Sequence, residues 1–133
     1  MPKEGAPAPL GETEELLQYL DGALADYAKY VGQIGQLKYT APQLLYYRDE
    51  VQEMLELLAQ EKVDLRQRWA QVRDLDLQLR AKASIFVREV GHANFKQYQI
   101  INNPPLSHWW WYLNRITVDT TPKSAPAWQW WKH

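Results

Sequence analysis

Cysteine is absent from all 133 residues of the chain. Disulfide bonds, thiolate nucleophiles and cysteine-based zinc or iron–sulfur sites are therefore excluded. The composition is also untypical of a small secreted scaffold, so a reducing cytoplasm is the expected compartment. The length predicts a single domain, because roughly 100 to 200 residues per domain is usual.

Long apolar runs are missing as well. The longest strictly hydrophobic stretch near the C-terminus covers residues 109–113, far short of the roughly 20 residues that a transmembrane helix needs. Residues 1–11 lack the apolar region of a secretory signal. The sequence therefore predicts no membrane-spanning segment, and we expect residues 1–11 to form a flexible leader.

Recognisable catalytic motifs are lacking too. Neither spacing of a glycine-rich phosphate loop occurs, and the serines lie outside nucleophile-elbow contexts. His92, His108 and His133 have neither an HExxH motif nor paired carboxylates at ligand spacing. We therefore expect a protein that is not an enzyme and that holds no metal or cofactor.

Helical periodicity dominates the first part of the chain. From Glu12, apolar residues recur at steps of three and four as far as Ile34, which predicts a first amphipathic helix. Pro42 disfavours helix at the residue before it, and Thr40 is the expected N-cap of a second helix. The short connection predicts that these two helices are antiparallel neighbours.

The apolar pattern then continues over residues 42–90. One unbroken helix of that length would be about 73 Å long, whereas a compact globule of this size has a radius of gyration of about 14 Å. Residues 42–90 therefore form either one long rod that needs a partner chain or two helices with a break at residues 61–64. Asp64 and Gln67 have the spacing of a capping box, which would start a new helix at the break. We favour the break, with a third helix over residues 65–90 that ends at Gly91.

The expected fold is all-α. A bundle of three or four helices occupies residues 12–103 and is built on the antiparallel hairpin, the fourth helix being a short one over residues 93–101. An irregular segment rich in proline and tryptophan, residues 104–133, packs on the bundle. Its first part fits a short helix capped by Ser107 or a strand equally well.

Tryptophan is concentrated at the end of the chain, with six of the seven indoles in the last 25 residues. Three consecutive side chains at 109–111 sweep about 200° around a helix, so they cannot all enter one core. We expect at least one indole to lie near the surface. Four interpretations remain open: packing in a groove of the bundle, anchoring of a protein partner, contact with a membrane interface, or stacking on sugars or single-stranded bases.

Charge divides the chain into two halves. Residues 1–62 carry five basic and eleven acidic side chains, a net charge of −6, and residues 63–133 carry ten basic and five acidic ones, a net charge of +5. The halves neutralise each other within the fold or across a self-association contact, or the basic half forms a face for an anionic partner. Arg66, Arg73 and Arg80 recur every seven residues, but intervening acidic residues make nucleic acid a weak candidate.

These features favour a non-catalytic, cytoplasmic protein-interaction or assembly module that binds a protein partner, self-association being one option. Aromatic and arginine anchors supply much of the binding energy of such interfaces. The alternatives are peripheral membrane association through the terminal tryptophans and, more weakly, nucleic-acid binding through the arginines of the third helix. The expected partner-binding residues are Trp109, Trp110, Trp111, Tyr112, Arg115, Arg80, Trp128, Trp130 and Trp131.

Overall fold

The computed structural model describes residues 8–115, and this range confirms the all-α prediction. Residues 1–7 and 116–133 lie outside the described residues, and with them most of the predicted leader and the predicted binding residues Trp128, Trp130 and Trp131. The elements, in chain order, are α1 (Ala8–Gly32), η1 (Lys38–Thr40), α2 (Pro42–Gln60), α3 (Arg66–Ala81), α4 (Ala83–Val90), α5 (His92–Asn102) and η2 (Trp109–Tyr112), where η denotes a 3-10 helix.

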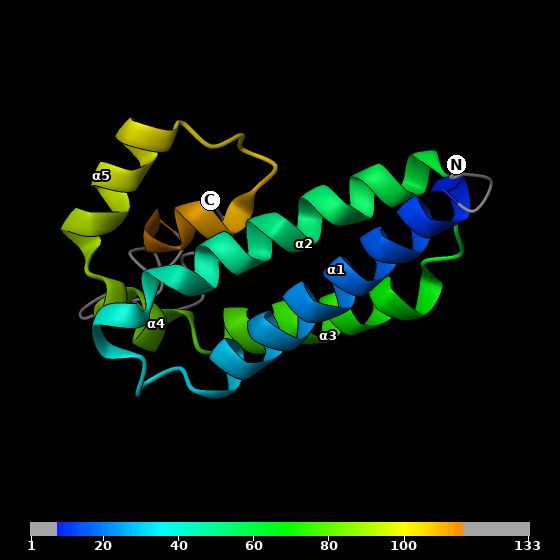
Figure 1. Ribbon diagram of the computed structural model, residues 1–133. Coiled ribbons are helices and arrows are strands. Elements are labelled where there is room, and N and C mark those ends of the chain that lie inside the picture. Colours follow the sequence, from blue (N-terminus) through cyan, green and yellow to red (C-terminus); the bar gives the residue numbers. More distant parts are fainter. Residues whose placement is uncertain (1–7, 116–133) are drawn as a thin grey trace, which may run out of the picture.

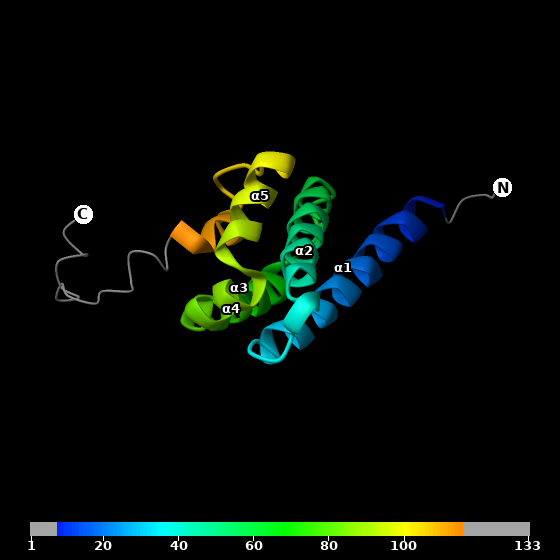
Figure 2. The ribbon, with the colours of Figure 1, turned by 90° about the vertical axis from the view of Figure 1, so that its left-hand side faces the viewer.

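Helices α1 and α2 form the antiparallel hairpin that the short connection predicts, and α3 packs against it (Figure 1). Helix α2 has α1 on one side and α5 with η2 on the other, and α5 and η2 contact each other (Figure 2). Within residues 8–115, no helix has both the length and the apolarity that crossing a bilayer would require. The buried faces of α1 to α5 and η2 meet in one core, whose largest fully buried members are Trp110, Trp111, Tyr27, Phe86 and Phe95.

The break between α2 and α3 occurs where the sequence predicts it. Helix α2 ends at Gln60 and α3 begins at Arg66. Asp64 accepts hydrogen bonds from the backbone N–H of Arg66 (3.1 Å) and from its guanidinium. The predicted capping box with Gln67 is wrong, because Leu65 holds the N-cap position of α3 without a side-chain bond. The side-chain bond from Arg66, followed by the backbone bond, lowers the pKa of Asp64 to about 2. The fourth short helix is also confirmed, as α5, and Gly91 before it has φ +97°, which favours glycine.

Three further local predictions are wrong. Helix α1 begins at Ala8, inside the predicted leader, because Pro9 fits the first turn of a helix, where its missing N–H costs nothing. The hydroxyl of Thr40 does not cap α2 but donates to the carbonyl of Leu37 (2.6 Å) in η1. The predicted third helix is two helices, α3 and α4, because the backbone leaves helical geometry at Lys82 (φ −105°, ψ 17°).

The bend at Lys82 directs α4 toward the connection between α1 and α2. From α4, the carboxylate of Glu89 accepts hydrogen bonds from the backbone N–H groups of Gly35 (2.8 Å), Leu37 (2.8 Å) and Lys38 (3.2 Å). These amides lie in a loop where Lys38 has a positive φ of 54°, so no regular helix can satisfy them. Glu89 therefore fixes the hairpin connection from a distant part of the chain.

A buried ion pair joins the first three helices. Arg48 on α2 is 3% exposed, and its Nε and Nη2 atoms donate to the two carboxylate oxygens of Asp76 on α3 (3.0 and 3.1 Å). The hydroxyl of Tyr27 on α1 donates to the same carboxylate (2.7 Å). Burial, followed by the charge of Asp76, raises the pKa of Tyr27 above its usual range. The tyrosine therefore stays protonated and remains a donor.

We predict that Asp76→Ala strongly destabilises the fold. It leaves the Arg48 guanidinium buried without its counter-charge and the Tyr27 hydroxyl without its acceptor. Breaking one side of a buried pair costs about 3–5 kcal/mol of the free energy of unfolding, measurable by urea denaturation. The matched control is Asp74→Ala on the same helix, where the exposed carboxylate contacts only Gln78. A loss for Asp76→Ala no larger than that of the control would contradict the role given to the pair.

Candidate functional site

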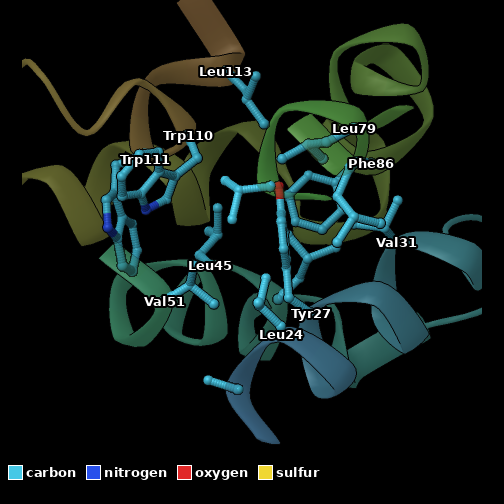
Figure 3. Packing of buried hydrophobic residues seen from close by; sticks show 14 of the residues in the cluster. Leu24, Tyr27, Val31, Leu45, Val51, Leu79, Phe86, Trp110, Trp111 and Leu113 are labelled. Carbon is cyan, nitrogen blue, oxygen red and sulfur yellow. The ribbon is translucent and has the colours of Figure 1, made fainter. Parts of the chain in front are cut away.

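The tryptophan triplet lies in η2, and the chain continues as a helical turn to Arg115. The sequence fits a helix or a strand at this segment, and residues 109–115 are helical. His108, without a side-chain capping bond, takes the position predicted for Ser107. Trp110 and Trp111 are each 1% exposed and point into the core beside Leu45 and Val51 of α2 (Figure 3). Packing against the bundle is therefore what the structure shows for these two indoles.

One carboxylate holds both buried indoles. Asp49 on α2 accepts hydrogen bonds at Oδ1 from the Nε1–H groups of Trp110 (2.8 Å) and Trp111 (2.9 Å). The imidazole of His108 stacks on the ring of Trp110 (centroids 4.6 Å apart), with Nδ1 3.4 Å from the same oxygen. Indole N–H groups need an acceptor when they are buried. Asp49 supplies it for both, which fixes η2 against α2.

The neighbouring residue Arg48 completes this attachment. Its guanidinium carbon lies 4.1 Å from the centroid of the Trp110 ring. A desolvated cation over an indole is attracted by the ring quadrupole, by about 2 kcal/mol. The guanidinium thus contacts η2 with its face while its edge pairs with Asp76. The buried ion pair and the tryptophan attachment are therefore one connected group of side chains.

Trp109, the third indole of the triplet, keeps part of its surface accessible, as expected for at least one of the three. Its ring is covered by the guanidinium of Arg80 on α3, at 4.1 Å from the centroid. The other predicted arginine, Arg115, lies over the ring of Tyr112 at 4.7 Å. The structure thus brings four of the predicted binding residues together as two arginine–aromatic pairs.

Beside the second pair is a groove of about 750 Å³ between α5 and η2. We call it the α5–η2 surface. Tyr112 and Arg115 line it from η2 and the turn that follows, and the hydroxyl of Tyr112 is fixed by the carbonyl of Pro104. Gln99 donates to the carbonyl of Trp111 (2.9 Å) and holds the two walls together. The groove is lined by Lys96, Gln99, Ile100, Asn103, Tyr112, Asn114 and Arg115.

The α5–η2 surface combines apolar side chains with positive charge. Ile100 is 81% exposed and the adjacent Ile101 is 67% exposed, although both are large aliphatic residues on a helix. Residues 90–115 contain no aspartate or glutamate, whereas Lys96 and Arg115 both line the groove. An acidic, partly apolar ligand is therefore the chemistry that this surface fits.

Sequence reasoning missed several residues of the site. Arg48 and Asp49 lie on a helix whose pattern predicts an apolar stripe and an acidic surface. One signal was available in the sequence: Arg48 follows Leu45 by three residues and Leu44 by four, which places it on the apolar face of the helix. An arginine on the apolar stripe of one helix and Asp76 on that of another indicate a buried pair. For Lys96 and Ile100 the sequence carries no comparable signal.

Trp110 and Trp111 cannot offer their indoles to a partner in this structure, because both are buried. They support η2 from the inside and are not part of an accessible surface. Within residues 8–115, no group of three or more acidic or histidine side chains is arranged to hold a metal ion.

Comparisons of the chain with protein-family models, with curated proteins and with solved structures found no match.

We predict that Asp49→Ala loosens the triplet from the bundle. The variant leaves two buried indole N–H groups without an acceptor, at about 1–3 kcal/mol each. Urea denaturation should show a loss of about 2 kcal/mol or more, and the tryptophan emission should shift to longer wavelength. Glu53→Ala, one turn further along α2 and exposed, is the control. Equal stability and unchanged emission in Asp49→Ala would show that the carboxylate does not hold the indoles.

Proposed function

We propose that this chain is a non-catalytic protein-interaction module that binds an acidic, partly apolar surface of a protein partner through the α5–η2 surface. The reducing cytoplasm expected from the cysteine-free sequence remains part of the proposal. So does an assembly role, in which the chain joins other proteins rather than transforming a substrate.

The observation that carries the proposal is the exposure of Ile100 in a groove that is lined by two cations and no anion. Single exposed apolar residues are ordinary on a protein surface. Here, however, Ile100 and Ile101 are adjacent on α5, and the groove beside them is walled by the aromatic ring of Tyr112. Apolar and aromatic side chains in a concave site, with arginine at its edge, are typical of the energetic centre of an interface.

Arg115 is well suited to anchor an acidic partner. Its guanidinium carbon lies over the Tyr112 ring, 4.7 Å from the centroid, and an arginine that contacts a ring with its face can still bind a carboxylate through its edge with two hydrogen bonds. Because the side chain is already positioned, less conformational entropy is lost on binding. Lys96 adds a second positive charge on the opposite wall. The surface therefore favours anionic partners and repels basic ones.

The other arginines of the chain support the α5–η2 surface over nucleic-acid binding. Arg66 is paired with Asp64, and Arg68 is paired with Asp21 of α1 (2.8 Å). Arg80 covers Trp109. Three of the four arginines on α3 thus already have a partner among the described residues, and only the exposed Arg73 does not, which disfavours binding of successive phosphates along this helix.

We predict that the double variant Ile100→Gln with Arg115→Gln loses partner binding while remaining folded. The full chain, immobilised, is used to capture proteins from a lysate at low salt. The affinity of a protein captured by the wild type should fall about tenfold or more and should weaken in about 0.5 M NaCl. Once purified, that protein is titrated against both chains.

The matched control is Leu77→Gln with Arg73→Gln, which removes an exposed aliphatic residue and an exposed arginine from α3. It should bind as the wild type does. If the groove variant and the control capture the same proteins with the same affinity as the wild type, the α5–η2 surface is not a binding site.

A membrane surface is the second candidate, favoured by the exposed Ile100 in a groove lined by two cations and by the adjacent exposed Ile101. Aliphatic groups with flanking lysine or arginine fit an interface of anionic lipids. We expect the protein partner instead, and therefore predict no co-sedimentation with phosphatidylserine vesicles at low salt. Co-sedimentation that the groove variant abolishes and the control retains would replace the protein proposal with the membrane one.

A further inference from the structure

We infer that the α5–η2 surface binds a second copy of this chain, at the acidic end formed by the start of α1 and the last turns of α2. Copies of the chain therefore associate head to tail. The inference rests on the proposed function in one respect, that the α5–η2 surface is a binding site. It adds the identity of the occupant and the geometry of the contact.

The acidic end has its own groove. It lies between α1 and α2, measures about 530 Å³ and is lined by Glu12, Glu15, Leu16, Tyr19 and Met54. Tyr19 is 54% exposed and Leu57, further along α2, is 44% exposed. We call this site the α1–α2 groove. Like the α5–η2 surface, it joins apolar side chains to charge, but the charge has the opposite sign.

The helical segments that line the two sites carry charges of opposite sign. Helix α1 has no lysine or arginine before Lys29, and α2 has none after Arg48, which is buried and paired. The helical segments that line the α1–α2 groove therefore carry acidic side chains and no lysine or arginine, and residues 90–115, which include the lining of the α5–η2 surface, contain no aspartate or glutamate. Patches of uniform and opposite sign attract each other and orient the encounter.

The apolar parts also fit one another. Ile100 projects from α5, with 81% of its surface exposed. The α1–α2 groove offers Leu16 and the flexible thioether of Met54, a side chain that adapts to the shape of an incoming residue. Tyr19 at the rim gives Arg115 an aromatic face on the neighbouring copy. Each site thus supplies what the other lacks.

One chain cannot bring its own two sites together. The α1–α2 groove lies at the start of α1 and the last turns of α2, and the α5–η2 surface lies toward the opposite end of the helical body (Figures 1 and 2). The contact must therefore form between copies. Since two different surfaces meet, the association is heterologous and yields open chains or closed rings rather than a two-fold dimer.

The first measurement is the mass of the full chain by sedimentation velocity over a range of concentrations. We expect mass to rise with concentration, and the association to weaken about tenfold in about 0.5 M NaCl, since the charges at both rims are screened. A strict monomer at low salt and high concentration overturns the inference. It leaves the proposed function to be decided by capture of a different protein.

The second measurement uses two variants, each lacking one site. Ile100→Gln with Arg115→Gln removes the α5–η2 surface, and Glu12→Gln with Glu15→Gln removes the charge of the α1–α2 groove. All four substituted residues are exposed. Each variant alone should be monomeric. Because each keeps the site that the other lacks, an equimolar mixture should form a complex of two chains that does not grow further.

The control pair Leu77→Gln with Arg73→Gln should associate as the wild type does. Circular dichroism and urea denaturation establish that each variant is folded. The inference is overturned if the wild type associates but either groove variant associates equally well, or if the two monomeric variants do not pair when mixed. An interface in which one surface met the same surface of the second copy would give the first of these results, because the variant that keeps that surface would still associate on its own.

Discussion

The carboxylate of Asp49 is the group on which the C-terminal part of this structure depends. It accepts the N–H groups of two consecutive, fully buried indoles, and without it Trp110 and Trp111 could not enter the core with their donors satisfied. Its neighbour Arg48 covers the Trp110 ring and, through Asp76 and Tyr27, connects the same attachment to α3 and α1. Two adjacent residues of α2 therefore hold η2 to the helical body.

The surface that we propose for binding follows from this attachment. With η2 fixed against α2, Tyr112 and Arg115 stand opposite α5, and the groove between them forms. The tryptophans thus contribute by supporting a binding surface, whereas the side chains that would meet a partner are Ile100, Lys96, Tyr112 and Arg115. The segregation of acidic residues to α1 and α2 gives the same chain a complementary surface at its other end. Head-to-tail association would use both halves of the charge asymmetry.

Much of the helical architecture could be predicted from periodicity and breakers. Leu17 to Ile34 mark one amphipathic stripe, Pro42 starts the next helix, and Gly91 ends α4 with a positive φ. The bend at Lys82 could not be predicted, because no glycine or proline marks it and Glu89 acts on a loop more than 50 residues away. The site was only half predictable. An aromatic run indicates where the energy of packing lies, but its acceptor, Asp49, is 61 residues away from Trp110 in the sequence.

Hydrogen exchange at the indole nitrogens tests the central claim most directly. In the full chain, labelled with ¹⁵N and assigned by single Trp→Phe substitutions, the Nε1–H groups of Trp110 and Trp111 should exchange orders of magnitude more slowly than an exposed indole, since both are buried and bonded to Asp49. That protection should be shared by the two residues. Exchange of either group at the rate of free tryptophan would contradict the account of how η2 is held, and with it the basis for the binding surface.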